Sequence, residues 1–144
     1  MIREAIFTAT VLLAASAAAP VTAGEVTITL TDLQTDAGDL FVSLQTQDNF
    51  MRGPDTASAK VENPQEATAT VTIQDIPDGD YALMVWHDID GDGTFSMGQM
   101  GPTDGWSMIG ASEMRGMPSW EAQSFTLEGN ASMTLTVIYP RDSQ

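Results

Sequence analysis

Apolar and polar residues alternate along much of the chain, with the two-residue period of a β-strand that buries one face. The pattern is clearest in residues 25–33, where Val26, Ile28 and Leu30 alternate with threonines. The same alternation predicts further strands over residues 40–47, 58–62, 67–76, 81–88, 125–127 and 133–139. Segments rich in Asp, Gly, Asn and Pro separate these strands, and such residues favour tight turns.

Helical periodicity is almost absent from the sequence. No window keeps a 3.6-residue apolar period, and only residues 118–122 could form a helical turn, with Ser119 as its N-cap. Residues 81–88 carry apolar side chains on both faces, which is typical of a central, covered strand. About seven short strands joined by turns indicate an all-β fold, a single antiparallel β-sandwich of the Ig-like or transthyretin-like kind over residues 24–144, with at most one short helical turn.

The first 23 residues have the pattern of a secretory signal peptide. Residues 5–19 are apolar and rich in alanine, and Val21, Thr22 and Ala23 supply small residues for cleavage. We therefore expect residues 1–23 to be removed and the mature protein to be periplasmic or secreted. No second long apolar stretch follows, so no membrane contact is expected of the mature form.

The chain is strongly acidic. It has 20 Asp and Glu residues against 5 Lys and Arg, a net charge of −15 at neutral pH. This charge argues against nucleic acid or an anionic membrane surface as a partner. It leaves two interpretations open, solubility in a salty environment and the binding of cations. The absence of cysteine excludes disulfides and thiolate metal sites.

An Asp- and Gly-rich segment after the predicted strand 81–88 is the main candidate for a chemical site. Its three aspartates and a glycine match positions one, three, five and six of an EF-hand-type calcium loop. Gln99 stands at position twelve, where a bidentate Glu is expected, so calcium affinity should be modest. The predicted Ca²⁺ ligands are Asp88, Asp90, Asp92, the Thr94 carbonyl, Ser96 (through water) and Gln99.

The calcium interpretation has one alternative, and the role of the neighbouring His87 is also open. The segment could be an ordinary Asp/Gly turn with solvated carboxylates, although three aspartates in one short loop repel one another without a cation. His87, the only histidine, falls on the inward face of its strand. It could be a buried side chain hydrogen-bonded to the backbone, or it could orient a ligand carboxylate from behind.

Methionines and tryptophans supply the other candidate functions. Residues 97–120 contain two Met-x-x-Met pairs, Met97 with Met100 and Met114 with Met117, and thioethers select Cu(I). The same methionines could instead fill gaps in a long loop. The alternative function is a non-metal protein- or glycan-interaction module that uses residues 97–120, with Trp86, Trp106 and Trp120 as a possible carbohydrate platform.

Enzymatic chemistry finds little support in the sequence. One histidine without cysteine does not give a usual catalytic zinc site, and no Gly-x-Ser-x-Gly segment accompanies it. We locate no catalytic residues and therefore expect no enzyme; Cu(I) binding or hydrolysis is the third alternative. Calcium is the expected cofactor, in a structural role, and a protein or glycan is the expected kind of partner.

Several motifs together resemble a known family. They are H-D-x-D-x-D-G at 87–93, P-x-D-G-W at 102–106, P-S-W-x-A-x-x-F at 118–125, the turn at 76–82 and a closing strand ending at Tyr139. Their order resembles the bacterial exported family catalogued as domain of unknown function 2141, over residues 26–139. The resemblance implies an exported single-domain β-sandwich without an established activity. That family usually has Asn at the second and third acidic positions and Asp where Ser96 stands, so the differences here concern coordination geometry.

Overall fold

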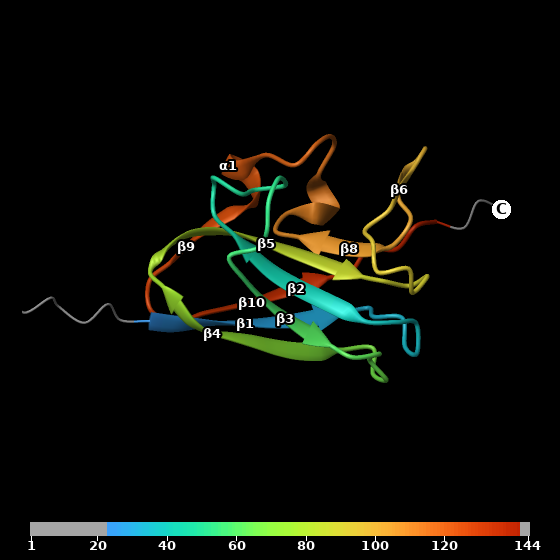
Figure 1. The fold of residues 1–144 in the computed structure, drawn as a ribbon, viewed down its shortest axis with the longest axis horizontal. Coiled ribbons are helices and arrows are strands. Elements are labelled where there is room, and N and C mark those ends of the chain that lie inside the picture. The colour runs from blue at the N-terminus through green and yellow to red at the C-terminus, as the bar shows by residue number, and fades with distance from the viewer. Residues whose placement is uncertain (1–22, 142–144) are drawn as a thin grey trace, which may run out of the picture.

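The computed structural model describes residues 23–141, and strands are its main regular secondary structure (Figure 1). The all-β fold class is therefore confirmed. The strands are β1 (Ala23–Thr31), β2 (Leu40–Gln45), β3 (Ala57–Val61), β4 (Ala69–Pro77), β5 (Gly79–His87), β6 (Met97–Gly98), β7 (Gly101–Pro102), β8 (Gly105–Met108), β9 (Ser124–Leu127) and β10 (Ala131–Thr136). The predicted signal peptide lies outside these residues, apart from Ala23 at the start of β1.

Two sheets pack face to face around the core. One has the order β10-β1-β4; the other has the order β3-β2-β5-β8, with β9 also paired to β5, and β6 and β7 form a separate two-stranded hairpin. The inward side chains of the alternating pattern form a core cluster that draws on both sheets. Val26, Ile28 and Leu30 of β1 and Val85 of β5 are completely buried in it, so the hydrophobic alternation of the sequence becomes the sandwich interior.

The strand pairing departs from the prediction in one respect. Every pair is antiparallel except β1 and β10, which run parallel with Val26 opposite Ala131. β9 lies in the other sheet, so the chain crosses between the sheets before β10 begins, and no hairpin turn fixes the direction of β10.

The described residues contain ten strands where the sequence predicted about seven. All seven predicted strands are present, and the additional β6, β7 and β8 lie in the Gly-, Met- and Trp-rich segment that follows β5. The prediction missed them because two are only two residues long and because β8, which reads Gly-Trp-Ser-Met, shows no clear alternation.

The described residues contain two short helical segments, whereas the sequence predicted at most one. The 3-10 turn η1 covers Ala111–Glu113, and α1 covers Trp120–Gln123. Ser119 is the N-cap of α1 as predicted, its hydroxyl accepting a hydrogen bond from the Ala122 N–H at 3.4 Å. Within residues 23–141, no helix is long and apolar enough to cross a membrane.

One end of the sandwich carries the Asp-rich segment. β5 ends at His87, and its last four residues pair antiparallel with β8, so His87 lies opposite Gly105. The 17 residues from Asp88 to Asp104 therefore leave and re-enter the sheet at adjacent positions. Residues far apart in this segment are thereby brought together at the sheet end.

Candidate metal centre

The loop after β5 is shaped by its own aspartate side chains. Gly91 and Gly93 adopt left-handed backbone conformations, with φ of 71° and 74°, which glycine adopts without strain. The carboxylates accept hydrogen bonds from nearby backbone N–H groups: Asp92 to Asp90 at 3.1 Å, Gly93 to Asp88 at 2.9 Å and Thr94 to Asp92 at 2.8 Å. These hydrogen bonds fix the carboxylates of Asp88, Asp90 and Asp92 against the backbone of the loop.

A fourth carboxylate enters from the other end of the segment. The β6–β7 hairpin reverses the chain, and Thr103 donates from both its backbone N–H and its hydroxyl to the Ser96 carbonyl, at 3.0 and 3.2 Å. This contact places Asp104, the residue before β8, beside the loop. The Asp104 side chain is completely buried.

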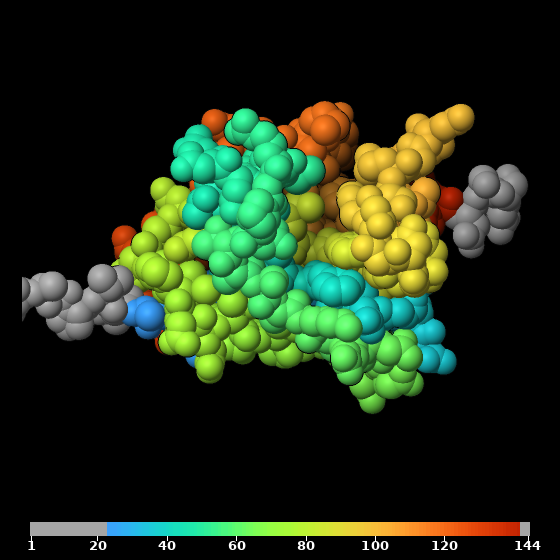
Figure 2. Space-filling view, in the orientation of Figure 1, coloured from blue at the N-terminus to red at the C-terminus, as the bar shows by residue number. Residues whose placement is uncertain are grey.

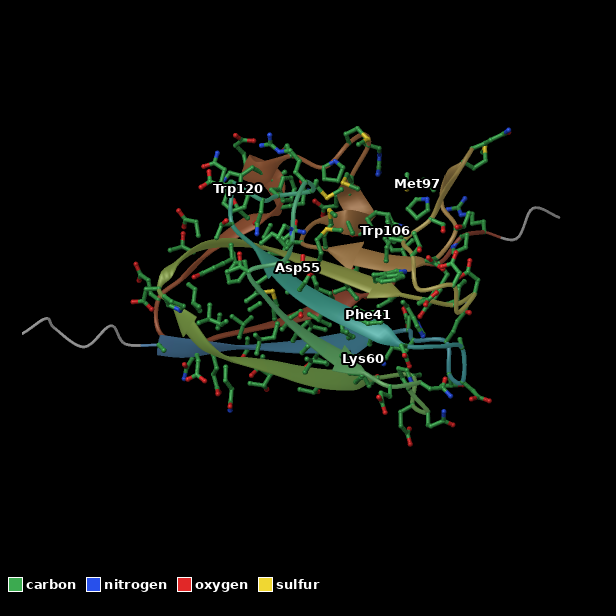
Figure 3. The ribbon with its side chains drawn as sticks, in the orientation of Figure 1. Phe41, Asp55, Lys60, Met97, Trp106 and Trp120 are labelled. Atoms are coloured by element: carbon green, nitrogen blue, oxygen red, sulfur yellow. The ribbon has the colours of Figure 1, made fainter. Side chains whose placement is uncertain are left out.

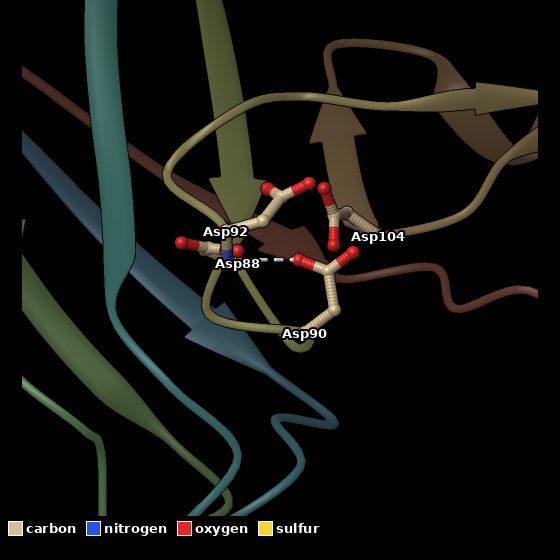
Figure 4. Close-up of side chains that lie close together, drawn as sticks. All are labelled: Asp88, Asp90, Asp92 and Asp104. Carbon is tan, nitrogen blue, oxygen red and sulfur yellow. Dashed lines mark hydrogen bonds between the residues drawn. The ribbon is translucent and has the colours of Figure 1, made fainter.

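The four aspartates form a compact cluster. One carboxylate oxygen from each of Asp88, Asp90, Asp92 and Asp104 lies within 4.8 Å of the others, and the carboxylates point toward one another (Figure 4). Asp88 and Asp104 are buried, whereas Asp90 and Asp92 are exposed. The cluster thus has a closed protein side and an open solvent side.

Two oxygens in the buried half of the cluster have no hydrogen-bond partner. Asp104 Oδ2 accepts from Trp86 Nε1 at 3.0 Å and from the Ser96 N–H at 3.4 Å, while Asp104 Oδ1 is buried without a donor. Asp88 shows the same division, with Oδ2 bonded to Gly93 and Oδ1 unpaired. A buried carboxylate oxygen without a partner is costly, since it has lost water and gained nothing.

The closeness of the four aspartates also changes the pKa of Asp90. The Asp92 N–H lowers the pKa of Asp90, but desolvation and the nearby carboxylates of Asp88, Asp104 and Asp92 together outweigh it. The net result is a pKa above the ordinary value for aspartate. Bringing these negative charges together therefore carries an electrostatic cost that a bound cation would remove.

The remaining predicted ligands lie at different places. Ser96 is next to the cluster, its hydroxyl 3.4 Å from Asp92 Oδ2 and 3.3 Å from the Thr94 carbonyl. Gln99 lies in the exposed turn of the β6–β7 hairpin, between Gly98 and Gly101. The roles of Thr94, Ser96 and Gln99 as ligands stay predictions. Asp104 was not among the predicted ligands, although it is the Asp of the P-x-D-G-W motif at residues 102–106.

His87 makes no hydrogen bond to the aspartates. Its Nε2 lies 3.1 Å from the Gly38 carbonyl, so it must carry a proton, and Nδ1 then accepts from the Tyr139 hydroxyl at 2.6 Å. Burial lowers the pKa of His87, and this outweighs the opposite effects of the Gly38 carbonyl and of Asp104, Asp88 and Asp39. The ring is therefore neutral and ties the turn before β2 to the C-terminal segment.

The methionines of residues 97–120 are mostly at the surface. Met97, Met100 and Met117 are exposed, whereas Met108 is buried in the sheet. Met97 and Met100 flank the tip of the β6–β7 hairpin, which projects from the sandwich (Figure 1). Cu(I) binding by these side chains stays a prediction.

Comparison with known proteins identifies the family of the chain. The sequence profile of the family described as "Uncharacterized protein conserved in bacteria (DUF2141)" matches residues 28–135. The chain belongs to this family. The resemblance noted in the sequence is thereby confirmed, and the match includes all four clustered aspartates of this DUF2141 protein. No curated protein and no solved structure matches the chain.

Proposed function

We propose that the acidic cluster binds one Ca²⁺ ion, which holds the loop after β5 against the start of β8. The observation that carries this proposal is the pair of unpartnered, buried oxygens, Asp88 Oδ1 and Asp104 Oδ1. They lie in a cluster that places four carboxylates within reach of one ion. An acidic turn made only for solubility would keep its carboxylates in water.

The ligand chemistry favours calcium over other cations. All four candidate side chains are carboxylates, the hard oxygen ligands that Ca²⁺ and Mg²⁺ prefer. Ca²⁺ tolerates irregular geometry and six to eight ligands, whereas Mg²⁺ requires a near-ideal octahedron. The single histidine faces Tyr139 and Gly38, and the sequence has no cysteine, so the donors favoured by zinc and copper are missing from the cluster.

A structural role follows from where the ligands lie. Asp88 directly follows β5 and Asp104 directly precedes β8, so an ion bound between them would join the two ends of the long connection. The exported location predicted from residues 1–23 would expose the site to calcium at levels that load extracellular modules, whose Kd is about 10⁻⁴–10⁻³ M. With Asp104 as a fourth carboxylate, we place the Kd near 10⁻⁴ M.

Calorimetric titration of the metal-free protein tests the proposal. We expect one Ca²⁺ per chain and weaker binding of Mg²⁺. Asp104→Asn keeps an acceptor for the Trp86 N–H but removes a charged ligand, so affinity for Ca²⁺ should fall about tenfold or more. Asp48→Asn, an exposed aspartate outside the cluster, is the matched control and should leave the affinity unchanged. Equal affinities for wild type and Asp104→Asn would contradict the proposed ligand set.

A further inference from the structure

The indole of Trp86 ties the aspartate cluster to the larger sheet. Trp86 lies one residue before the end of β5, and its Nε1 donates a hydrogen bond to Asp104 Oδ2 at 3.0 Å. Within residues 23–141, neither Trp106 nor Trp120 makes a hydrogen bond through its indole N–H. The acceptor is the buried carboxylate whose other oxygen, Oδ1, has no donor. This contact is therefore particular to Trp86, and it holds one of the aspartates on which the calcium proposal depends.

The Trp86 ring is fixed by its neighbours on the outer face of the larger sheet. Phe41 of β2 lies opposite Trp86 in the strand register and stacks on it, with the ring centroids 4.7 Å apart and an interplanar angle of 19°. Phe95, in the segment after β5, meets the ring edge-on at 6.4 Å. Figure 3 marks Phe41 on this face, and Figure 2 shows the segment after β5 (yellow) lying against β2 (cyan). Because the stacked and edge-on contacts both favour one ring orientation, they set the direction of the indole N–H.

A fixed donor decides which oxygen of Asp104 is left for an ion. The terminal torsion of an aspartate side chain is broad, so the carboxylate rotates readily unless hydrogen bonds hold it. The Trp86 N–H at 3.0 Å and the Ser96 N–H at 3.4 Å both donate to Oδ2. Oδ1 is thereby left unpaired on the buried side of the cluster, as the oxygen that Asp104 can offer. Hydrogen-bond partners behind a metal ligand commonly orient it, and losing one typically costs about 10–100-fold in metal affinity.

Trp106 shows that nearness to Asp104 is not enough for this role. It lies opposite Trp86 in the register of β5 and β8, and both residues are half-buried. It also follows Asp104 by only two residues in the chain. The two tryptophans differ in the indole N–H, which reaches the carboxylate only from Trp86. Trp106 is therefore the matched control for Trp86.

We propose that Trp86 is a positioning residue of the Ca²⁺ site: its N–H holds Oδ2 of Asp104 so that Oδ1 faces the ion. The role depends on the calcium binding proposed above. Trp86 itself does not touch the ion and acts only through Asp104. A tryptophan that merely filled the outer face of the sheet would affect stability, whereas a positioning Trp86 also sets the affinity for Ca²⁺.

The test is a calorimetric titration of Ca²⁺ into Trp86→Phe, which keeps an aromatic ring beside Phe41 and removes the donor. We expect Ca²⁺ affinity to fall about 10–100-fold relative to the wild type, with one ion still bound per chain. Trp106→Phe should leave the affinity unchanged. Thermal melts in chelator establish that both variants are folded before they are titrated.

A second variant removes the N–H while the shape of the ring is kept. In a protein with Trp106→Phe and Trp120→Phe, the remaining tryptophan is replaced by benzothienylalanine, which has sulfur in place of the indole N–H. Compared with the same protein carrying the natural indole, affinity for Ca²⁺ should again fall about 10–100-fold. An unchanged affinity would show that the stacked ring and not its hydrogen bond supports the site, and would overturn the proposal.

The indole N–H also gives a signature in the wild type. Its NMR resonance, assigned by its loss in Trp86→Phe, should shift on Ca²⁺ addition with the same midpoint as the calorimetric titration, and by more than the Trp120 resonance. A Trp86 resonance that is unmoved at saturation would overturn the proposal, as would a Trp86→Phe affinity equal to that of the wild type. No Ca²⁺ binding by the wild type would instead overturn the calcium site itself, and the role of Trp86 with it.

Discussion

At the scale of single residues, the candidate site depends on which oxygen atoms have partners. Each buried aspartate uses one oxygen to hold the loop and leaves the other unpaired beside the exposed Asp90 and Asp92. The spacing of Asp88, Asp90 and Asp92 was enough to predict a cation site from sequence. Nothing in the spacing revealed Asp104, because a hairpin that the pattern did not show brings it back to the loop.

The Tyr139 hydroxyl makes two hydrogen bonds. It accepts from the Gln34 N–H at 3.0 Å and donates to His87 Nδ1 at 2.6 Å. Tyr139→Phe should lower the free energy of unfolding by about 1–3 kcal/mol, because buried His87 loses its partner. The control is Tyr81→Phe, which loses a single bond to the Pro77 carbonyl. Denaturant melts should show a larger loss for Tyr139→Phe, and the reverse order would contradict this network.

His87 should titrate below its ordinary pKa. As the only histidine of the chain it gives an unambiguous imidazole NMR signal, and burial lowers its pKa in the folded state. A lowered pKa means that the unfolded chain binds the proton more tightly. The stabilisation from neutral His87 is therefore complete above about pH 6.5 and is lost as the pH falls through the folded-state pKa. A native-state pKa at or above 6.5 would contradict the assignment of neutral His87.

At the scale of elements, the predictable strands were those with a regular apolar alternation or, for β5, a long apolar run. β1 alternates between buried and half-buried residues, β4 alternates between buried and more exposed residues as far as Ile73, and both were found from the pattern alone. β8 was missed because three of its four residues are buried, so tertiary packing, not alternation, determines it. The parallel pairing of β1 with β10 depends on where the chain crosses between sheets, which local sequence does not encode.

The start of β8 is also where packing leaves no room for a side chain. A Cβ atom at Gly105 would lie 2.5 Å from the Tyr139 ring and 3.0 Å from the Cβ of His87. We expect Gly105→Ala to cost about 1–3 kcal/mol of stability through overpacking. Gly116→Ala is the matched control, since a Cβ there meets nothing within 4 Å. Chemical denaturation compares the two, and a Gly105→Ala variant as stable as Gly116→Ala would refute the packing at this position.

At the scale of the whole molecule, the acidic composition supplies the carboxylates and the fold determines where they gather. The net charge of −15 predicted an attraction for cations but did not say where they would bind. Folding brings four carboxylates together at one end of the larger sheet, and this cluster is the proposed Ca²⁺ site. The overall all-β class followed from the alternating pattern, whereas the aspartate cluster depends on contacts between segments that are distant in the sequence.

The most direct test of calcium binding is a set of thermal melts of the wild type in calcium and in chelator. At a tenfold excess over its Kd, a ligand that binds only the folded state adds about 1.4 kcal/mol, which corresponds to a rise in Tm of roughly 4–6 °C. Sodium at matched ionic strength should raise Tm less, because screening reduces repulsion without supplying a coordinated ion. Asp90→Ala combined with Asp92→Ala should remove the calcium-specific increment and leave the sandwich folded. Identical wild-type melts in calcium and in chelator would contradict the account and identify the cluster as an ordinary acidic turn.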